Sequence, residues 1–314
     1  MTISRSLILA LCFITVNLSA CQDKKHKKGH KKHQKEQLST NEESAAVSLD
    51  DKFTLIAEMP KKLKELSGIV KDGDYLWAIS DNPKAGIFKL DLKGNVVQEL
   101  HLNSLTMTDV EDVTADAEFV YIADVGDNDG TRKERQIIKI KKSEIPSGAE
   151  VNVTGQVIHF TFPAQSGTHT KKTNENDCES LLTYKESLYL FTKRRDDKQT
   201  ELYKLTKNAG DQTPEAISEF NSKGLITGAA INEQGTEVSL VGYQGGHKSP
   251  FIWNFASFKS DDFFSGDHQV YVLDNDDKDW QVESVTYAAD GTLLFGCEKT
   301  PDFAAAIYKI AVGK

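Results

Sequence analysis

Three glutamates stand at equivalent positions of three matched segments and are the strongest candidates for chemistry in this sequence. The segments are Val-Glu-Asp-Val at 110–113, Cys-Glu-Ser-Leu at 178–181 and Val-Glu-Ser-Val at 282–285. If these segments are equivalent strands, Glu111, Glu179 and Glu283 converge on one axis. Carboxylates so placed repel one another unless a cation, a basic partner or shared protons offset the charge, and such oxygen ligands suit calcium or magnesium. An acid–base pair among them is the other chemistry that this arrangement allows.

A structural role competes with this interpretation. Each glutamate would then only accept hydrogen bonds from the backbone of a neighbouring unit, and the sequence does not decide between the two. A wider set of polar residues is expected to form the rim of a binding face around the glutamates. This set is Asp81, Asn82, Asp109, Asp124, Asp127, Asn128, Arg132, Asp177, Lys193, Arg194 and Lys299. Its basic members could pair the carboxylates or bind an anionic ligand, and a solvated loop is the alternative for any single member.

The elements that must position these residues form a fivefold repeat. Each unit begins with an apolar run around a small or acidic residue, and a second apolar run follows after a hairpin turn. The first runs lie at 66–69, 110–113, 178–181, 226–229 and 282–285, and the second at 75–80, 119–124, 187–192, 237–242 and 292–297. A third strand, in which apolar residues alternate with a mostly lysine position, is expected at 87–90, 137–140, 202–205, 252–255 and 307–310. A fourth, outer strand is expected at 96–102, 156–162, 215–220 and 269–273.

The two ends of the repeat complement each other. The last unit has no fourth strand of its own, and an apolar run at 53–57 stands unclaimed before the first unit. We therefore predict an all-β, five-bladed β-propeller over 53–314, closed by an N-terminal strand that completes the last blade. A six-bladed ring, with a degenerate blade between 147 and 176, is the alternative. In such a ring the start of each innermost strand and the end of each second strand meet at one mouth of the central channel.

The first blades resemble a known family. Glu-Leu-Ser-Gly-Ile from Glu65, followed by Leu-Trp-Ala-Ile-Ser-Asp-Asn, is similar to the opening blade of bacterial SdiA-regulated-type propellers. Thr-Asp-Val-Glu-Asp-Val from Thr108, with Gly-Asp-Asn at 126–128 and Arg132, is similar to a Trp-Glu-Asp-Ile-Ala…Gly-Asp-Asn…Arg signature of related propeller lipoproteins, with valine in place of tryptophan. The resemblance covers most of the repeat and implies the propeller fold, but it implies little about function.

The N-terminus is typical of an exported protein. Arg5 precedes an apolar run at 7–16 that is too short to span a bilayer but has the size of a signal-peptide core. The following Leu-Ser-Ala-Cys resembles the bacterial lipobox, which implies a signal peptide at 1–20 and lipidation of Cys21. Residues 21–52 are then predicted to form a lipidated, Lys/His-rich disordered tether. We expect a lipoprotein of the bacterial cell envelope, anchored by its lipid to a membrane and facing the periplasm or the cell surface.

Charge is divided unevenly along the chain. The formal net charge of −9 includes a stretch at 22–37 that has seven lysines against two acidic residues, so the rest of the chain is strongly acidic. An acidic body argues against nucleic-acid binding, which requires cationic surface. Cys178 and Cys297 are expected to be two small buried side chains, and a disulfide between them is the alternative.

Two functions remain open from the sequence. The first is a binding module that uses the channel mouth to hold a small molecule, a glycan or a protein, with a calcium ion as the possible cofactor. The second is a metal-dependent hydrolase of the phosphoesterase or lactonase type, in which Glu111, Glu179 or Glu283 holds the metal and activates water. A monomer is expected in either case. The histidines are scattered and indicate no catalytic centre.

Overall fold

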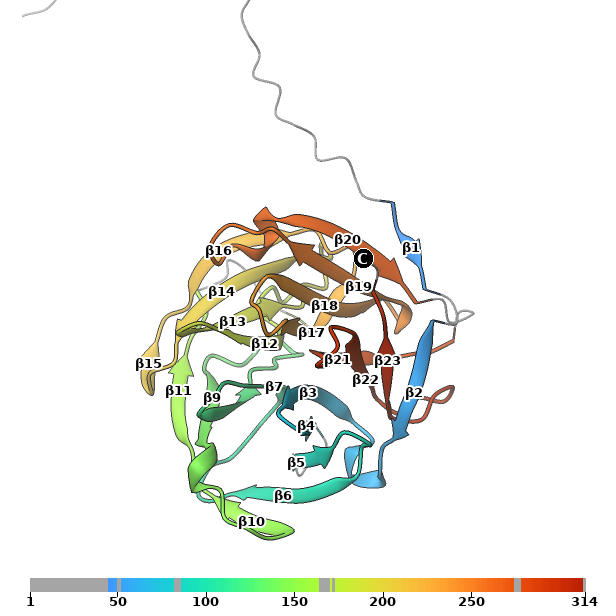
Figure 1. Ribbon diagram of the computed structural model, residues 1–314. Coiled ribbons are helices and arrows are strands. Elements are labelled where there is room, and N and C mark those ends of the chain that lie inside the picture. Colours follow the sequence, from blue (N-terminus) through green and yellow to red (C-terminus); the bar gives the residue numbers. More distant parts are fainter. Residues whose placement is uncertain are drawn as a thin grey trace, which may run out of the picture. The chain divides into compact units, whose positions relative to one another are not determined.

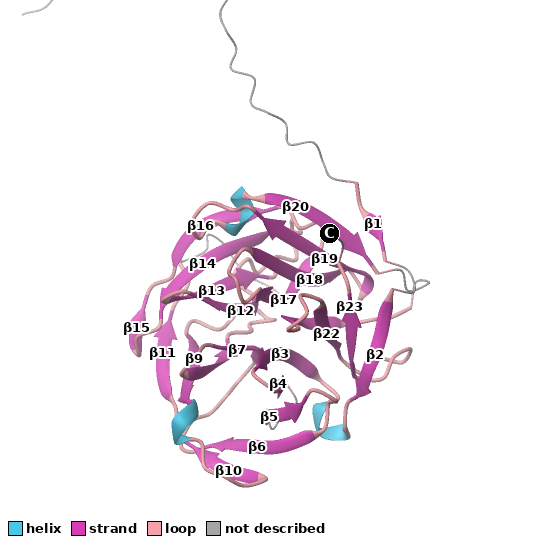
Figure 2. Cartoon of the chain, viewed as in Figure 1, coloured by secondary structure: helices cyan, strands magenta, loops and turns pink. Residues whose placement is uncertain are grey.

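Five small β-sheets surround one axis in the computed structural model (Figure 1). The structure describes residues 45–49, 52–81, 86–163, 170, 173–273 and 278–312, within the compact unit Glu43–Lys314. The helices among these residues are single 3₁₀ turns at Lys61–Leu63, Lys142–Glu144 and Phe263–Ser265 (Figure 2). The predicted five-bladed propeller is thus confirmed. No helix in the described ranges has the length and apolar character needed to cross a membrane.

The first two blades contain five strands each. Blade one comprises, from the axis outward, β3 (Leu66–Asp72), β4 (Tyr75–Ser80), β5 (Gly86–Asp91), β6 (Val96–Leu102) and β10 (Glu150–Val153). Blade two comprises β7 (Val110–Ala115), β8 (Phe119–Asp124), β9 (Arg135–Lys141), β11 (Gln156–Phe160) and β15 (Gly210–Gln212). The segment expected to hold a sixth blade therefore supplies outer strands to blades one and two, and the six-bladed alternative is wrong.

The remaining three blades complete the ring. Blade three comprises β12 (Cys178–Tyr184), β13 (Ser187–Thr192), β14 (Thr200–Thr206) and β16 (Glu215–Phe220). Blade four comprises β17 (Leu225–Ile231), β18 (Glu237–Gln244), β19 (Lys248–Ala256), β20 (Asp267–Val272) and β1 (Val47–Ser48). Blade five comprises β21 (Val282–Tyr287), β22 (Leu293–Cys297), β23 (Ala306–Ile310) and β2 (Phe53–Glu58). The antiparallel pairing of β2 with β23 is the predicted closure by the N-terminal strand.

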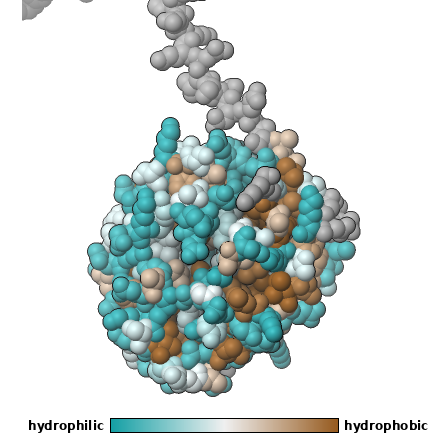
Figure 3. Space-filling model, in the orientation of Figure 1, coloured by the Kyte–Doolittle hydropathy of each residue, from teal (hydrophilic) through white to brown (hydrophobic). Residues whose placement is uncertain are grey.

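The hydrophobic core lies between the blades. Five clusters of buried apolar side chains each join residues of two neighbouring blades, as expected when every sheet packs face to face with the next. Cys178 lies between blades two and three and Cys297 between blades four and five, so both are buried free thiols without a disulfide. On the face drawn in Figure 3, hydrophobic side chains gather over blade five, near the closure. The innermost strands contact one another around the axis and place their ends at the channel mouths.

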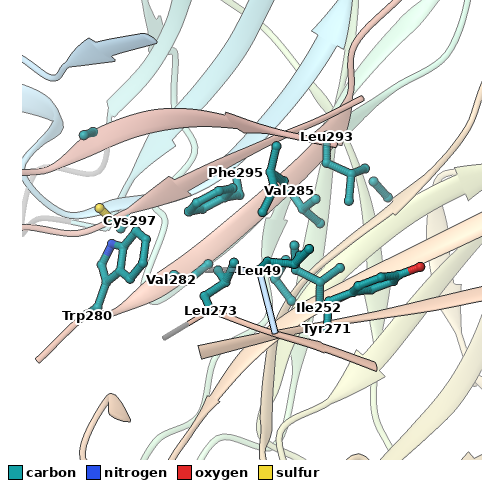
Figure 4. Packing of buried hydrophobic residues seen from close by; sticks show 14 of the residues in the cluster. Leu49, Ile252, Tyr271, Leu273, Trp280, Val282, Val285, Leu293, Phe295 and Cys297 are labelled. Carbon is teal, nitrogen blue, oxygen red and sulfur yellow. The ribbon is translucent and has the colours of Figure 1, made fainter. Parts of the chain in front are cut away.

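The N-terminal segment of the described chain differs from the sequence prediction. The tether was expected to run as far as residue 52, but Val47 and Ser48 pair in parallel with Tyr271 and Val272 at the outer edge of blade four. The short pairing is held by Leu49, whose side chain is buried between blades four and five (Figure 4). The serines and alanines before it gave no strand pattern. Cys21, the predicted signal peptide and the Lys/His-rich part of the tether lie outside the described residues.

Replacing Leu49 with alanine is expected to lower the free energy of unfolding by about 2–3 kcal/mol, because a buried leucine is lost from the packed seam. Urea denaturation would measure the loss. Val47→Ala is the matched control, since Val47 is exposed in the same segment and its truncation should change stability by less than about 0.5 kcal/mol. Equal, small effects of both substitutions would show that the segment contributes nothing to the fold.

Candidate functional site

Each innermost strand carries a β-bulge at the same place. The pairing register with the second strand shifts between Leu66 and Gly68 in blade one, and equivalent shifts occur in the other four blades. The residues left without a partner in the register are Ser67, Glu111, Glu179, Thr227 and Glu283, and all five are buried. Bulges commonly redirect a side chain, and here they aim the three predicted glutamates at the same end of the channel.

These glutamates line one pocket of about 380 Å³ at the channel mouth. The other polar or charged side chains that line it come from all five blades or the loops between them: Asp81, Asn128, Lys193, Arg195, Tyr243, His247, Gln281 and Glu298. A pocket of this size is within the range that accommodates small molecules. The sequence prediction that the repeat brings these carboxylates to one mouth agrees with this geometry.

Lys193 and Glu179 form a buried ion pair inside the pocket. Lys193 Nζ lies 2.9 Å from Glu179 Oε2, and both side chains are about 95% buried. Burial raises the pKa of Glu179 to about 7, although Lys193 acts to lower it. Burial would lower the pKa of Lys193, but the charges of Glu179, Tyr243 and Glu283 outweigh it and raise this pKa well above its usual range. Lys193 is therefore a fixed positive charge committed to Glu179.

Arg195 supplies the second positive charge of the pocket. Its guanidinium pairs with Asp177 and donates a hydrogen bond to Asn128 Oδ1 at 2.6 Å. The sequence predicts Arg194 at this place. Arg194 instead pairs with Glu219 on β16 at 3.1 Å and does not line the pocket. The next residue, Arg195, which begins a turn, lines it in place of Arg194.

Three aspartates expected at the rim stabilise the loops instead. Asp124 accepts a hydrogen bond from the backbone N–H of Asp109 at 2.9 Å. Asp127 is buried and pairs with Arg135 at 2.6 Å, and its own backbone N–H donates to Asp177 Oδ1 at 3.0 Å. These carboxylates fix the backbone on which Asp109 and Arg195 depend, but they do not line the pocket.

The remaining expected rim residues also lie outside the pocket. Arg132 pairs with Asp124 at 2.9 Å and donates to three backbone carbonyls, so it stabilises the same loop. Lys299 is exposed and does not line the pocket. Asn82 lies outside the described residues.

A compact acidic group lies at one side of the pocket, which Asp81 and Glu111 line, with Asp109 next to them. Asp81, Asp109 and Glu111 each offer a carboxylate oxygen within 4.8 Å of the other two. Burial and the charge of Asp109 raise the pKa of Asp81 to about 7. Burial also raises the pKa of Asp109, with a contribution from Asp177, and it raises the pKa of Glu111 well above its usual range, with a contribution from Glu179. The folded protein thus disfavours negative charge at this group unless a cation offsets it.

A second acidic pair faces it from blade five. Glu283 Oε1 accepts hydrogen bonds from Gln281 Nε2 at 2.7 Å and from the Tyr243 hydroxyl at 3.4 Å. The side chain of Glu298 makes no hydrogen bond or ion pair within the described part of the chain. Burial and the neighbouring Glu283 raise the pKa of Glu298 to about 9.

Three polar lining residues stand at positions that the repeat does not predict. They are Arg195, His247 and Gln281. Tyr243 and Glu298 end or follow second strands, where the repeat predicts polar groups of the rim. His247 belongs to the loop between β18 and β19, and its Nδ1 lies 2.9 Å from Asp279. No repeated position marks that loop, which explains why sequence reasoning missed it.

Comparison with known proteins identifies the fold but no family. No family model matches the sequence, and no curated protein matches it. Glutaminyl cyclase of Myxococcus xanthus has a similar structure, with a TM-score of 0.50 and 8% identity over 85% of this chain and 100% of that one. A bifunctional GH43-CE protein of Bacteroides eggerthii has a TM-score of 0.50 and 13% identity over 83% of this chain and 34% of that one. A streptogramin B lyase has a TM-score of 0.41, 11% identity, and coverage of 83% and 97%.

The two similarities with a TM-score of 0.50 support the propeller fold alone, because identities this low carry no function. The resemblance to SdiA-regulated-type propellers receives no support from them beyond the fold and stays a prediction.

Proposed function

We propose that this protein is a binding module whose channel-mouth pocket holds a small, positively charged ligand. The supporting observation is an excess of unmatched carboxylates. Lys193 and Arg195 are each committed to a carboxylate, whereas the side chains of Glu111 and Glu298 have no hydrogen bond or ion pair within the described residues. An anionic ligand would meet no uncommitted cation among the described lining residues, and a cationic ligand would offset the unmatched charge.

The organic part of such a ligand fits best on the side of blade five. Glu283 and Glu298 offer acceptors for an ammonium or guanidinium group, and the buried side chains of Leu225 and Tyr243 provide apolar wall. The small volume favours a small molecule over a glycan or a protein among the ligands that the sequence left open. The expected calcium ion belongs to the same proposal and would occupy the opposite, acidic side of the pocket.

The location predicted from the N-terminus completes this proposal. A signal peptide would direct export, and a lipid on Cys21 would hold the propeller at a membrane of the bacterial envelope. Its pocket would then bind small ligands outside the cytoplasm. A strongly acidic body agrees with a partner that is not nucleic acid.

The metal-dependent hydrolase is not favoured. That function would use Glu111, Glu179 or Glu283 to hold a metal and activate water. Glu179 is paired with Lys193, and Glu283 accepts hydrogen bonds from Gln281 and Tyr243. Two of the three carboxylates are therefore already stabilised by protein groups.

Glu298→Gln is expected to weaken binding of small organic cations about tenfold to a hundredfold, because one of the two acceptors can then no longer ionise when the positive group binds. Isothermal titration calorimetry of the purified chain would use ethylamine, putrescine and agmatine as cationic probes, with acetate and glucose as anionic and neutral ones. We expect the cations to bind and the others not to bind.

Glu233→Gln is the matched control for this experiment. Glu233 is an exposed carboxylate at the opposite mouth of the same channel, so its neutralisation removes one charge without touching the site. Binding of acetate in preference to the amines, or equal affinity of the wild type and Glu298→Gln for the amines, would overturn the proposal.

A further inference from the structure

We infer that Asp81, Asp109 and Glu111 form a divalent-cation site, most suited to calcium, in the wall of the channel-mouth pocket. This inference deepens the proposed function, because it places the cation beside the pocket that would hold the organic ligand. The three carboxylate oxygens lie within 4.8 Å of one another, a spacing that one ion can bridge. The sequence had assigned the metal to Glu111, Glu179 and Glu283, so two of the three ligands now differ.

Glu111 is the residue that points most directly to a bound ion. Its side chain is 93% buried and lines the pocket, yet no hydrogen bond or ion pair to it exists within the described part of the chain. A carboxylate so enclosed, with no protein partner, must be satisfied by water or a cation from the pocket, and its charge favours the cation. The β-bulge on β7 fixes Glu111 at the channel mouth, so the side chain is held there by the fold.

The two aspartates are held in place and keep free ligand atoms. Asp81 Oδ1 accepts a hydrogen bond from the backbone N–H of Val110 at 3.3 Å, and the Asp109 carboxylate accepts one from the backbone of Asn128. Each carboxylate has two oxygens, so one backbone bond orients the group and leaves further lone pairs for an ion. Glu179 differs because Lys193 already offsets its charge through Oε2, although its Oε1 makes no hydrogen bond within the described residues.

The backbone at Gly126 packs closely against the carboxylates of Glu111 and Asp109. A Cβ atom at this residue would lie 2.2 Å from Glu111 Oε1 and 2.5 Å from Asp109 Oδ2, so only glycine lets the loop pass so near. The carboxylates therefore have backbone behind them and the pocket in front. An ion there would have protein oxygens on one side and open positions toward the pocket.

The donor set favours a hard cation. All three ligands are carboxylates, without the imidazole or thiolate that zinc and copper prefer. Calcium takes six to eight oxygens with flexible geometry, so three carboxylates would leave positions for water or a ligand oxygen. Magnesium has the same ligand preference but keeps more of its own water.

The test is calcium titration of the purified chain after chelator treatment, by calorimetry and by thermal melting. Wild-type protein should bind about one calcium ion per chain and melt at a higher temperature in calcium than in chelator. Asp109→Asn and Glu111→Gln should each weaken calcium binding at least about tenfold, since even residues that only orient a metal ligand have effects of that size.

Melting in chelator distinguishes a variant that has lost the ion from a variant that folds poorly. Both substitutions remove an unfavourable buried charge, so in chelator the variants should melt at or above the wild type, and only the gain from calcium should disappear. Glu233→Gln is the control and should bind calcium as the wild type does. If the protein binds magnesium and not calcium, the three carboxylates form a divalent-cation site, and its ion is magnesium.

Glu298→Gln separates this inference from the proposed function. It should lose organic cations and keep calcium, whereas Asp109→Asn should lose calcium even if no organic ligand is found. Equal calcium affinity in wild type, Asp109→Asn and Glu111→Gln, or no uptake of calcium, magnesium or manganese by the wild type, would overturn the inference.

Discussion

Lys193→Met is expected to destabilise the propeller by about 3–5 kcal/mol at pH 8, because Glu179 loses its main positive partner and must either carry a buried charge or take up a proton well above its ordinary pKa. The two side chains are 2.9 Å apart and almost fully enclosed. Arg195 Nη2 remains 3.9 Å from Glu179 Oε1, but Arg195 pairs with Asp177, and the charge of Glu283 still acts to raise the pKa of Glu179. Methionine retains most of the volume of lysine, which limits the contribution from lost packing.

The loss should depend on pH in a definite direction. The pKa of Glu179 is about 7 in the folded protein against an ordinary 4.5, so the folded state binds the proton more tightly than the unfolded state. The contribution of this group to stability is therefore full below about pH 4.5 and is lost as the pH rises through about 7. Without Lys193 the penalty on the charged form grows. The variant should consequently differ from wild type much less at pH 5 than at pH 8.

Urea denaturation at the two pH values, in chelator, would measure this difference. The double variant Glu179→Gln/Lys193→Met should recover to within about 1 kcal/mol of the wild type, because no buried charge remains unpaired. Lys204→Met is the matched control in the same blade. Lys204 pairs with Asp261 near the surface and should cost about 1 kcal/mol or less. A penalty that is the same at both pH values and is not rescued would indicate lost packing instead of an unpaired charge.

The fold could be predicted because each unit repeats the same physical pattern. Apolar runs, hairpin turns and alternating third strands recur five times. The last unit lacks a fourth strand, and the apolar run at 53–57, before the first unit, can supply it. The extra edge strands β1, β10 and β15 were missed because they are only two to four residues long. Such short strands are stabilised by the edge they cover and carry little pattern of their own.

The site could be predicted only where it follows the repeat. Glu111, Glu179 and Glu283 occupy the same bulge in three blades, so their convergence was visible in the sequence. Whether Arg194 or Arg195 lines the pocket depends on the direction in which each side chain leaves the loop. That direction is set by tertiary contacts, here the pairing of Arg195 with Asp177, and no spacing rule reports it.

The same limit explains why the acidic group was not predicted as a unit. Asp81 follows the second strand of blade one, whereas Asp109 precedes the first strand of blade two. They meet because neighbouring blades pack side by side, and the backbone N–H of Val110 bonds to Asp81 across that junction. The repeat predicts which positions face the channel, but distances between blades decide which of them share an ion.

Asp112→Ala is expected to lower the free energy of unfolding by about 3 kcal/mol, because it removes the acceptors of two backbone hydrogen bonds from a buried junction between blades. Asp112 stands at the position that is small in every other unit, and it is 2% exposed. Its Oδ2 accepts the backbone N–H of Leu181 on β12 at 2.8 Å, and its Oδ1 accepts that of Val113 at 2.8 Å. Loss of the side chain would leave the N–H of Leu181 buried without an acceptor.

Ser180→Ala provides the matched control at the equivalent position of the next blade. The Ser180 hydroxyl is buried and has no hydrogen-bond partner among the described residues, so its removal should be neutral to within about 0.5 kcal/mol. Asp112→Asn should be intermediate, because the amide keeps one acceptor and turns an N–H toward the other donor. Urea denaturation gives the stabilities, and hydrogen exchange at the Leu181 amide reports the junction itself. If Asp112→Ala is as mild as Ser180→Ala and leaves that amide protected, Asp112 does not join blades two and three, and packing alone holds the innermost strands together.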